Sequence, residues 1–102
     1  MESSSIKTKS KEIFTEVHDR DHFLSILKEN TGIMVFKFGA DWCVPCQSIK
    51  DDVEKFFANT PDNVICFDLD IDESFDLYAF LKSKKMVTGV PSILAYIKGN
   101  ES

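Results

Sequence analysis

Positive charge is scarce in this sequence. Arg20 is the only arginine, and 12 basic residues stand against 17 acidic ones, which gives a formal net charge of -5. A protein that binds nucleic acid needs a patch or stripe of cationic side chains to neutralise phosphate groups. The sequence has no such stripe, so nucleic acid is not an expected partner.

Long apolar segments are also missing. A membrane-spanning helix needs roughly 18 or more apolar residues in succession, and no segment approaches that length. Residues 1–7, MESSSIK, lack the apolar core of a secretory signal peptide. We therefore expect no membrane association and a cytoplasmic location.

Cysteine is sparse, and the three cysteines are an odd number for a secreted disulfide framework. Cys43 and Cys46 lie one helical turn apart and are candidates for redox chemistry or a metal site. Zinc needs about four ligands, and Cys66, His18 and His22 offer no second close pair. Redox chemistry is therefore the favoured interpretation, with Cys66, inside an apolar segment, predicted to be a buried structural thiol.

The remaining composition indicates one folded domain. Hydrophobic residues make up 43% of the 102 residues and include nine phenylalanines, which is enough for a packed core. Residues 1–10 are rich in serine and lysine and predict a flexible tail. The predicted domain covers residues 11–102.

Apolar periodicity predicts strands and helices in alternation. A first strand lies near 13–17, and a helix capped by Asp19 or Asp21 follows and ends at 30–32. The near-continuous apolar run 33–38 is typical of a central strand covered on both faces. The pattern of the remaining residues predicts a helix from the cysteines to 60, a strand at 64–72, a helix at 73–86, a strand at 92–97 and a turn at 98–100. This order favours an α/β layer structure.

Three motifs carry a family resemblance. Residues 38–46 read FGADWCVPC at a strand-to-helix junction, residues 68–72 read DLDID, and residues 89–92 read GVPS. A CxxC alone is a weak signal, but one with this context is strong. Over roughly residues 11–102 the chain resembles thioredoxin. The resemblance implies a thioredoxin-like fold with a central mixed sheet flanked by helices, and a cis peptide bond between Val90 and Pro91 that faces the two sulfurs.

The resemblance also implies different roles for the two cysteines. Cys43, the more exposed thiol, would attack a disulfide of a partner protein, and Cys46 would then resolve the mixed disulfide. The start of a helix lowers the pKa of a cysteine placed there. Val44 is bulkier than the glycine usual at its position and should partly shield Cys43. The partner would be held by Trp42, Val44, Pro45, Val90 and Pro91.

The implied activity is that of a thiol–disulfide oxidoreductase which reduces partner-protein disulfides. Such an enzyme would be recycled by a thioredoxin reductase-like enzyme and needs neither a bound cofactor nor a metal. One alternative is a non-catalytic binding module with the same fold. A glutathione-linked, glutaredoxin-like enzyme is a second alternative, against which the Asp41-Trp42 pair argues.

One departure from the family concerns charge beneath the cysteines. Thioredoxins usually carry a buried aspartate six residues before the first cysteine, where this sequence has Lys37. Asp68 falls where some members carry the lysine that partners this aspartate. We hypothesise a charge-swapped pair under Cys46, in which Lys37 favours the thiolate and either group handles the proton. The alternative is that Lys37 extends from its strand to the surface.

Two further departures concern length and bending. Asp51 stands where many thioredoxins have a helix-bending proline, which predicts a straighter helix. Thioredoxins continue past the turn at 98–100 into a last strand and a C-terminal helix, both of which we expect to be missing. The strand at 92–97 would then be an open edge, in a fragment of a longer protein or in a chain that dimerises or compensates otherwise.

Overall fold

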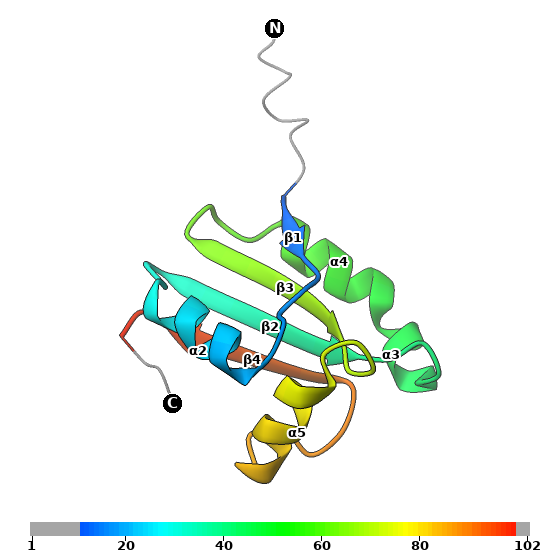
Figure 1. Ribbon diagram of the computed structural model, residues 1–102. Coiled ribbons are helices and arrows are strands. Elements are labelled where there is room, and N and C mark those ends of the chain that lie inside the picture. The colour runs from blue at the N-terminus through cyan, green and yellow to red at the C-terminus, as the bar shows by residue number, and fades with distance from the viewer. Residues whose placement is uncertain (1–10, 100–102) are drawn as a thin grey trace, which may run out of the picture.

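A computed structural model of the protein describes residues 11–99. Their elements, in chain order, are β1 (Ile13–Phe14), α2 (Arg20–Lys28), β2 (Ile33–Gly39), α3 (Val44–Ser48), α4 (Lys50–Ala58), β3 (Val64–Asp70), α5 (Phe75–Ser83) and β4 (Ser92–Ile97) (Figure 1). The alternation of strands and helices is as predicted. The predicted tail at 1–10 and Asn100 of the predicted turn lie outside the described residues.

The described strands form a mixed sheet in the order β1-β3-β2-β4. Strand β2 lies at its centre, parallel to β3 and antiparallel to β4, and every residue from Met34 to Gly39 is buried. The apolar run therefore does mark a strand covered on both faces. The predicted fold class, a central mixed sheet flanked by helices, is confirmed.

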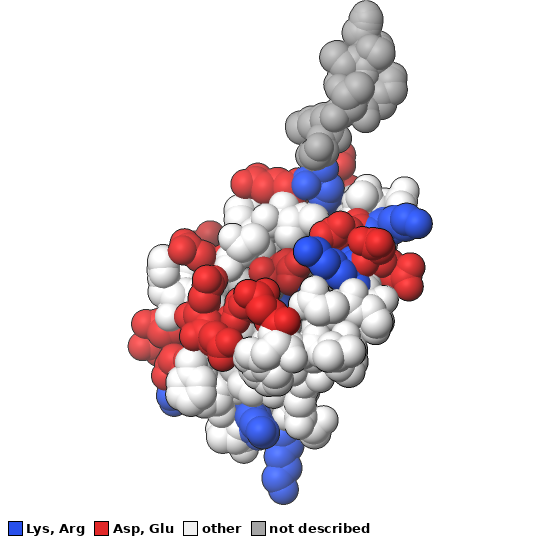
Figure 2. Space-filling model, turned by 90° about the vertical axis from the view of Figure 1, so that its right-hand side faces the viewer, with Lys and Arg blue, Asp and Glu red and all other residues white. Residues whose placement is uncertain are grey.

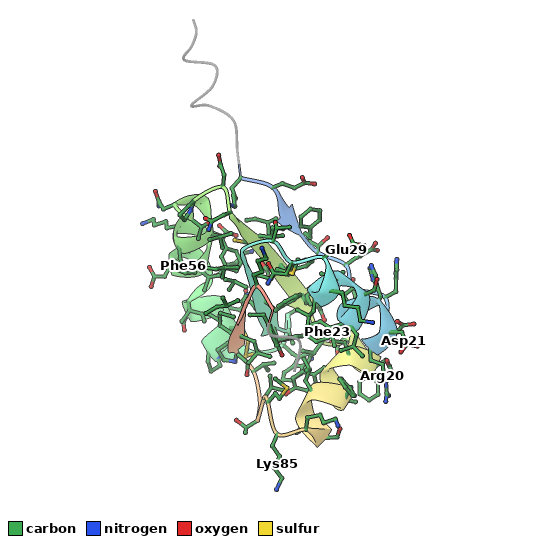
Figure 3. The ribbon with its side chains drawn as sticks, turned by 90° about the vertical axis from the view of Figure 1, so that its left-hand side faces the viewer. Arg20, Asp21, Phe23, Glu29, Phe56 and Lys85 are labelled. Atoms are coloured by element: carbon green, nitrogen blue, oxygen red, sulfur yellow. A yellow bond between two sulfur atoms is a disulfide. The ribbon has the colours of Figure 1, made fainter. Side chains whose placement is uncertain are left out.

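Successive residues of β2 point to opposite faces of the sheet and supply two cores. On one face, Phe36 packs against Phe23 of α2, and both belong to a core that includes Leu81 of α5. Val35 packs with Val53 and Phe57 of α4 on the other face. Figure 3 shows Phe23 between helix α2 and the sheet.

The single helix predicted from the cysteines to 60 is wrong, because it is divided into two helices at Ile49. Ile49 has φ -102° and ψ 2° and ends α3 before α4 begins. The Ser48 hydroxyl donates a hydrogen bond of 2.9 Å to the Pro45 carbonyl, competing with the helical backbone pattern at this point. A proline is therefore not needed to separate the cysteine-bearing turn from α4.

Several element ends also differ from the prediction. Strand β1 has two residues, β3 ends at Asp70, and α5 is shorter than the predicted helix at 73–86. Lys85, with φ 62°, is left-handed and cannot continue the helix. Asp19 is the N-cap of α2, since its carboxylate accepts the His22 N–H at 2.9 Å.

Strand β4 is an edge strand within residues 11–99, as expected. It pairs with β2 alone, and Ile93 and Ile97 on one of its faces are exposed. In the described part of the chain, no helix has the length and apolar character needed to cross a membrane.

Gly32 sits where a side chain would collide with the backbone. A Cβ there would overlap the carbonyl oxygen of Asn63, which is fixed by a 3.0 Å hydrogen bond from the Ile33 N–H. We expect Gly32→Ala to lower the free energy of unfolding by about 1–3 kcal/mol, as overpacking does. Gly89→Ala is the matched control, because a Cβ at Gly89 has nothing within 4 Å. Equal midpoints of urea unfolding for the two variants would contradict this.

An exposed ion pair connects α2 to α5. Arg20 Nη2 lies 2.9 Å from Asp76 Oδ1, the Arg20 backbone N–H donates to Asp76 Oδ2 at 3.0 Å, and the guanidinium lies 5.2 Å from the centre of the Phe80 ring. The hydrogen bonds from the Arg20 side chain and backbone hold the pKa of the Asp76 carboxyl below its ordinary value.

This pair predicts a pH-dependent contribution to stability. Because the folded-state pKa of Asp76 is lowered, its contribution is fully present above the ordinary carboxyl pKa and is lost as pH falls through the folded value. We expect Asp76→Asn to unfold at lower urea than the parent at neutral pH, with the difference closing below about pH 4. A difference that persists unchanged at pH 3 would rule out the ionised carboxylate as its cause.

Candidate active site

The two sulfurs lie just beyond the end of the central strand. Cys43 is the N-cap of α3 and forms a disulfide with Cys46, their Cα atoms 5.2 Å apart. The Cys46 backbone N–H donates to Cys43 Sγ at 3.2 Å, so the sulfur occupies the place of a capping oxygen. Pro45 in the first turn fixes φ where a missing N–H costs nothing.

Both sulfur-bearing residues are buried, with exposed fractions of 5% for Cys43 and 2% for Cys46. Cys43 is the more exposed of the two, as predicted, although both are largely shielded from solvent. A loop covers it: Cys43 Sγ lies 3.7 Å from the carbonyl oxygen of Val90. The peptide bond between Val90 and Pro91 is cis, as the resemblance implied.

The residues expected to hold a partner fall into two groups. Trp42 and Val44 are 64% and 77% exposed, and Pro45 is exposed beside them, whereas Val90 and Pro91 are partly buried. Val44 thus projects into solvent next to the disulfide. Figure 2 looks onto the α3 end of the molecule, where uncharged surface is bordered by both acidic and basic side chains.

Asp72 belongs to this region, although the sequence places it only at the end of the strand predicted at 64–72. Its Oδ2 accepts the indole N–H of Trp42 at 3.0 Å, and its own backbone N–H donates to Asp70 Oδ1 at 2.7 Å. Parallel strands β2 and β3 end at the same edge of the sheet, which brings residues 42 and 72 together. That shared edge was the signal that could have found the contact.

Beneath the disulfide lies a cavity of about 260 Å³. Lys37 faces it and is only 7% exposed, with Nζ 3.4 Å from Asp68 Oδ1. The two residues are register partners across β2 and β3. The structure therefore brings together the two charges that the sequence hypothesis paired, and Lys37 does not extend into bulk solvent.

The same cavity reaches the resolving sulfur. A Cβ placed on Gly39 would lie 3.4 Å from Lys37 Nζ and 3.5 Å from Cys46 Sγ. The ammonium and the sulfur thus flank one small space that the missing side chain of Gly39 leaves open.

The other candidate ligands and thiols lie elsewhere. Cys66 is fully buried in the core beneath α4, with its sulfur 3.6 Å from Thr60 Oγ1. His18 and His22 stack on each other at 4.7 Å on the surface. Among residues 11–99, no group of three or more cysteine, histidine, aspartate or glutamate side chains is placed to hold a metal ion.

A disulfide that caps a helix at the end of a central strand, under a cis-proline loop, defines a thiol–disulfide oxidoreductase with a thioredoxin fold. The sequence model of the family Thioredoxin matches residues 14–102. Thioredoxin-2 of Saccharomyces cerevisiae is 30% identical over 87 residues, which are 85% of this chain and 79% of that protein. Thioredoxin-1 of the same yeast is 33% identical over 69 residues, which are 68% and 62% of the two chains. The chain belongs to the thioredoxin family.

Solved structures share the fold. Thioredoxin from Trypanosoma brucei brucei superimposes with a TM-score of 0.70 at 21% identity and covers 94% of this chain and 79% of its own. Thioredoxin from Malassezia sympodialis gives a TM-score of 0.66 at 22% identity, over 92% and 76% of the two chains.

The contact between Trp42 and Asp72 should restrain the indole, which is the only tryptophan of the chain. We expect Asp72→Ala to lower the steady-state anisotropy of tryptophan fluorescence, because the ring loses its acceptor. Asp72→Asn keeps an acceptor oxygen and should retain most of the parent value. Equal anisotropy in the parent and the alanine variant would show that the hydrogen bond does not hold the ring.

Proposed function

We propose that the protein reduces disulfide bonds of partner proteins, with Cys43 as the attacking thiol and Cys46 as the resolving thiol. The observation that carries this proposal is the hydrogen bond from the Cys46 N–H to Cys43 Sγ. In the dithiol state this donor stabilises the thiolate of Cys43, and the thiolate is the reactive form. We assign the activity to the domain of residues 11–102.

The exchange takes two steps. The Cys43 thiolate attacks one sulfur of the partner disulfide, which forms a mixed disulfide and releases the other partner sulfur as a thiolate that takes a proton from solvent. The Cys46 thiolate then attacks Cys43 Sγ and displaces the second partner sulfur. The partner gains two electrons, and Cys43 and Cys46 end as the disulfide seen in the structure.

The partner would lie across the surface formed by Trp42, Val44, Pro45, Val90 and Pro91. Two features support this placement. Trp42 and Val44 are large apolar side chains that remain mostly exposed, as expected of a surface that meets another protein. The Val90 carbonyl adjoins the attacking sulfur, so a partner chain beside this loop would lie next to Cys43.

Turnover needs a source of electrons. We propose that a thioredoxin reductase-like enzyme returns the disulfide to the dithiol, as the family membership indicates. A dithiol also persists only in a reducing compartment, so the cytoplasm is the proposed location.

The low exposure of Cys43 favours a second candidate, a binding module that holds a partner through the same surface without turnover. The two candidates differ in whether Cys43 must react. If the protein is a non-catalytic binding module, its partner should bind Cys43→Ser as tightly as the parent.

The reductase proposal predicts that insulin reduction by dithiothreitol is accelerated by the parent protein. Cys43→Ser should fall to the rate of dithiothreitol alone, because the nucleophile is lost. In a separate incubation of the reduced variant with insulin without dithiothreitol, Cys46→Ser should accumulate a mixed disulfide, visible as a mass adduct that dithiothreitol then removes. Cys66→Ala is the control and should keep the parent rate, since Cys66 lies in the other core. A parent rate no higher than that of Cys43→Ser would favour the binding module.

A further inference from the structure

We propose that the buried ammonium group of Lys37 stabilises the thiolate of Cys46, so that the resolving thiol is activated by a cation. The consequence for turnover rests on the proposed reductase function. The effect of Lys37 on the Cys46 thiol does not rest on that function, because the pKa of this thiol can be measured in a protein without reductase activity.

The argument starts from the position of the charge. Lys37 lies on β2, two residues before Gly39, and its side chain is 9% exposed. Its Nζ and Cys46 Sγ lie within 3.4 and 3.5 Å of one point, the Cβ position of Gly39, so their separation cannot exceed the sum of these distances. A charge of opposite sign at such range favours the ionised form of a group strongly when both are shielded from water.

Burial distinguishes Lys37 from the other charges around the cavity. Those charges come from the β2–α3 turn, α4, β3 and the segment after β3, and they are Asp41, Lys50, Asp68, Asp70 and Glu73. Asp41, Lys50 and Glu73 are exposed, where solvent screens their fields. Asp70 already accepts the Asp72 N–H at 2.7 Å. Lys37 is therefore the least screened charge that faces the sulfur.

Asp68 does not cancel this effect. Its side chain is 37% exposed, compared with 9% for Lys37, so water screens the carboxylate more than the ammonium. The ion pair instead gives the buried ammonium a counter-charge that offsets part of the cost of its desolvation. When Cys46 ionises, its thiolate becomes a second negative partner of the ammonium at the same cavity.

The chemical consequence falls on the second exchange step. The Cys46 thiol gives its proton to solvent and remains a thiolate beside Lys37. In the mixed disulfide this thiolate attacks Cys43 Sγ, the bond between Cys43 and the partner breaks, and the electron pair leaves on the partner sulfur. A general base is then not required at the moment of attack. Stabilising the thiolate also favours the dithiol over the disulfide and makes the pair more oxidising.

The test titrates Cys46 directly. In Cys43→Ser protein labelled with ¹³Cβ-cysteine, the Cys46 and Cys66 signals are followed by NMR as pH rises, and Cys66 is the internal reference. We expect Lys37→Met to raise the pKa of Cys46 by about one unit, a roughly tenfold weaker acid. Lys37→Gln is a second neutral variant, and Lys37→Arg, which keeps the charge, should stay near the parent value.

The control removes an equal charge elsewhere. Lys55 is exposed on α4 and does not line the cavity, so Lys55→Met should leave the Cys46 pKa unchanged. An unchanged pKa in Lys37→Met and Lys37→Gln would overturn the proposal. It would also be overturned by a Lys37→Arg shift as large as that of Lys37→Met, which would point to packing, or by an equal shift in Lys55→Met, which would point to net charge.

A second measurement uses the intact cysteine pair. Trp42 fluorescence reports the fraction of protein in the disulfide form at equilibrium with dithiothreitol. The measurement is made at a pH above the Cys46 pKa. There, a tenfold loss of thiolate stability in Lys37→Met should lower the reduction potential of the cysteine pair by about 30 mV. An unchanged potential would overturn the proposal. Insulin reduction tests the reductase function and not the effect of Lys37. A parent protein that fails to reduce insulin while Lys37 still shifts the Cys46 pKa would refute the reductase function alone.

Discussion

The structure depends on the pairing of β2 between β3 and β4. This one strand supplies both cores, because its alternate side chains pack under α2 and α5 on one face and under α4 on the other. Its register with β3 also sets Lys37 beside Asp68, and its end at Gly39 positions the turn that leads to Cys43. Packing and chemistry are therefore fixed by the same backbone hydrogen bonds.

Placing a lysine on such a strand has a physical cost, since a buried ammonium loses its hydration. The protein meets this cost in two ways. Asp68 on the neighbouring strand supplies a counter-charge, and the small residue at position 39 leaves a cavity next to the ammonium. A side chain at position 39 would fill part of that cavity. The polar pocket thus exists at the end of a buried apolar strand because positions 39 and 68 accommodate it.

The surface above the disulfide is organised differently. Trp42 and Val44 project from a turn, and the indole is held by a carboxylate that follows β3. The loop before β4 covers Cys43 from the other side. Three segments distant in sequence meet here because the ends of β2 and β3 and the start of antiparallel β4 share one edge of the sheet.

Sequence alone determined the features that depend on local pattern. The apolar run at 33–38 marked the central strand, Asp19 or Asp21 marked a helix start, and residues 38–46 identified the redox pair and its family. Contacts between distant segments required the tertiary structure. The bond between Trp42 and Asp72, the covering of Cys43 and the shared cavity of Lys37 and Cys46 depend on strand register and loop packing. The break at Ile49 was missed because a serine hydroxyl, and no proline, competes with the helical backbone there. Local patterns depend on residues that are neighbours in the sequence. These contacts, in contrast, arise only when the strands pair and bring distant residues to one edge of the sheet.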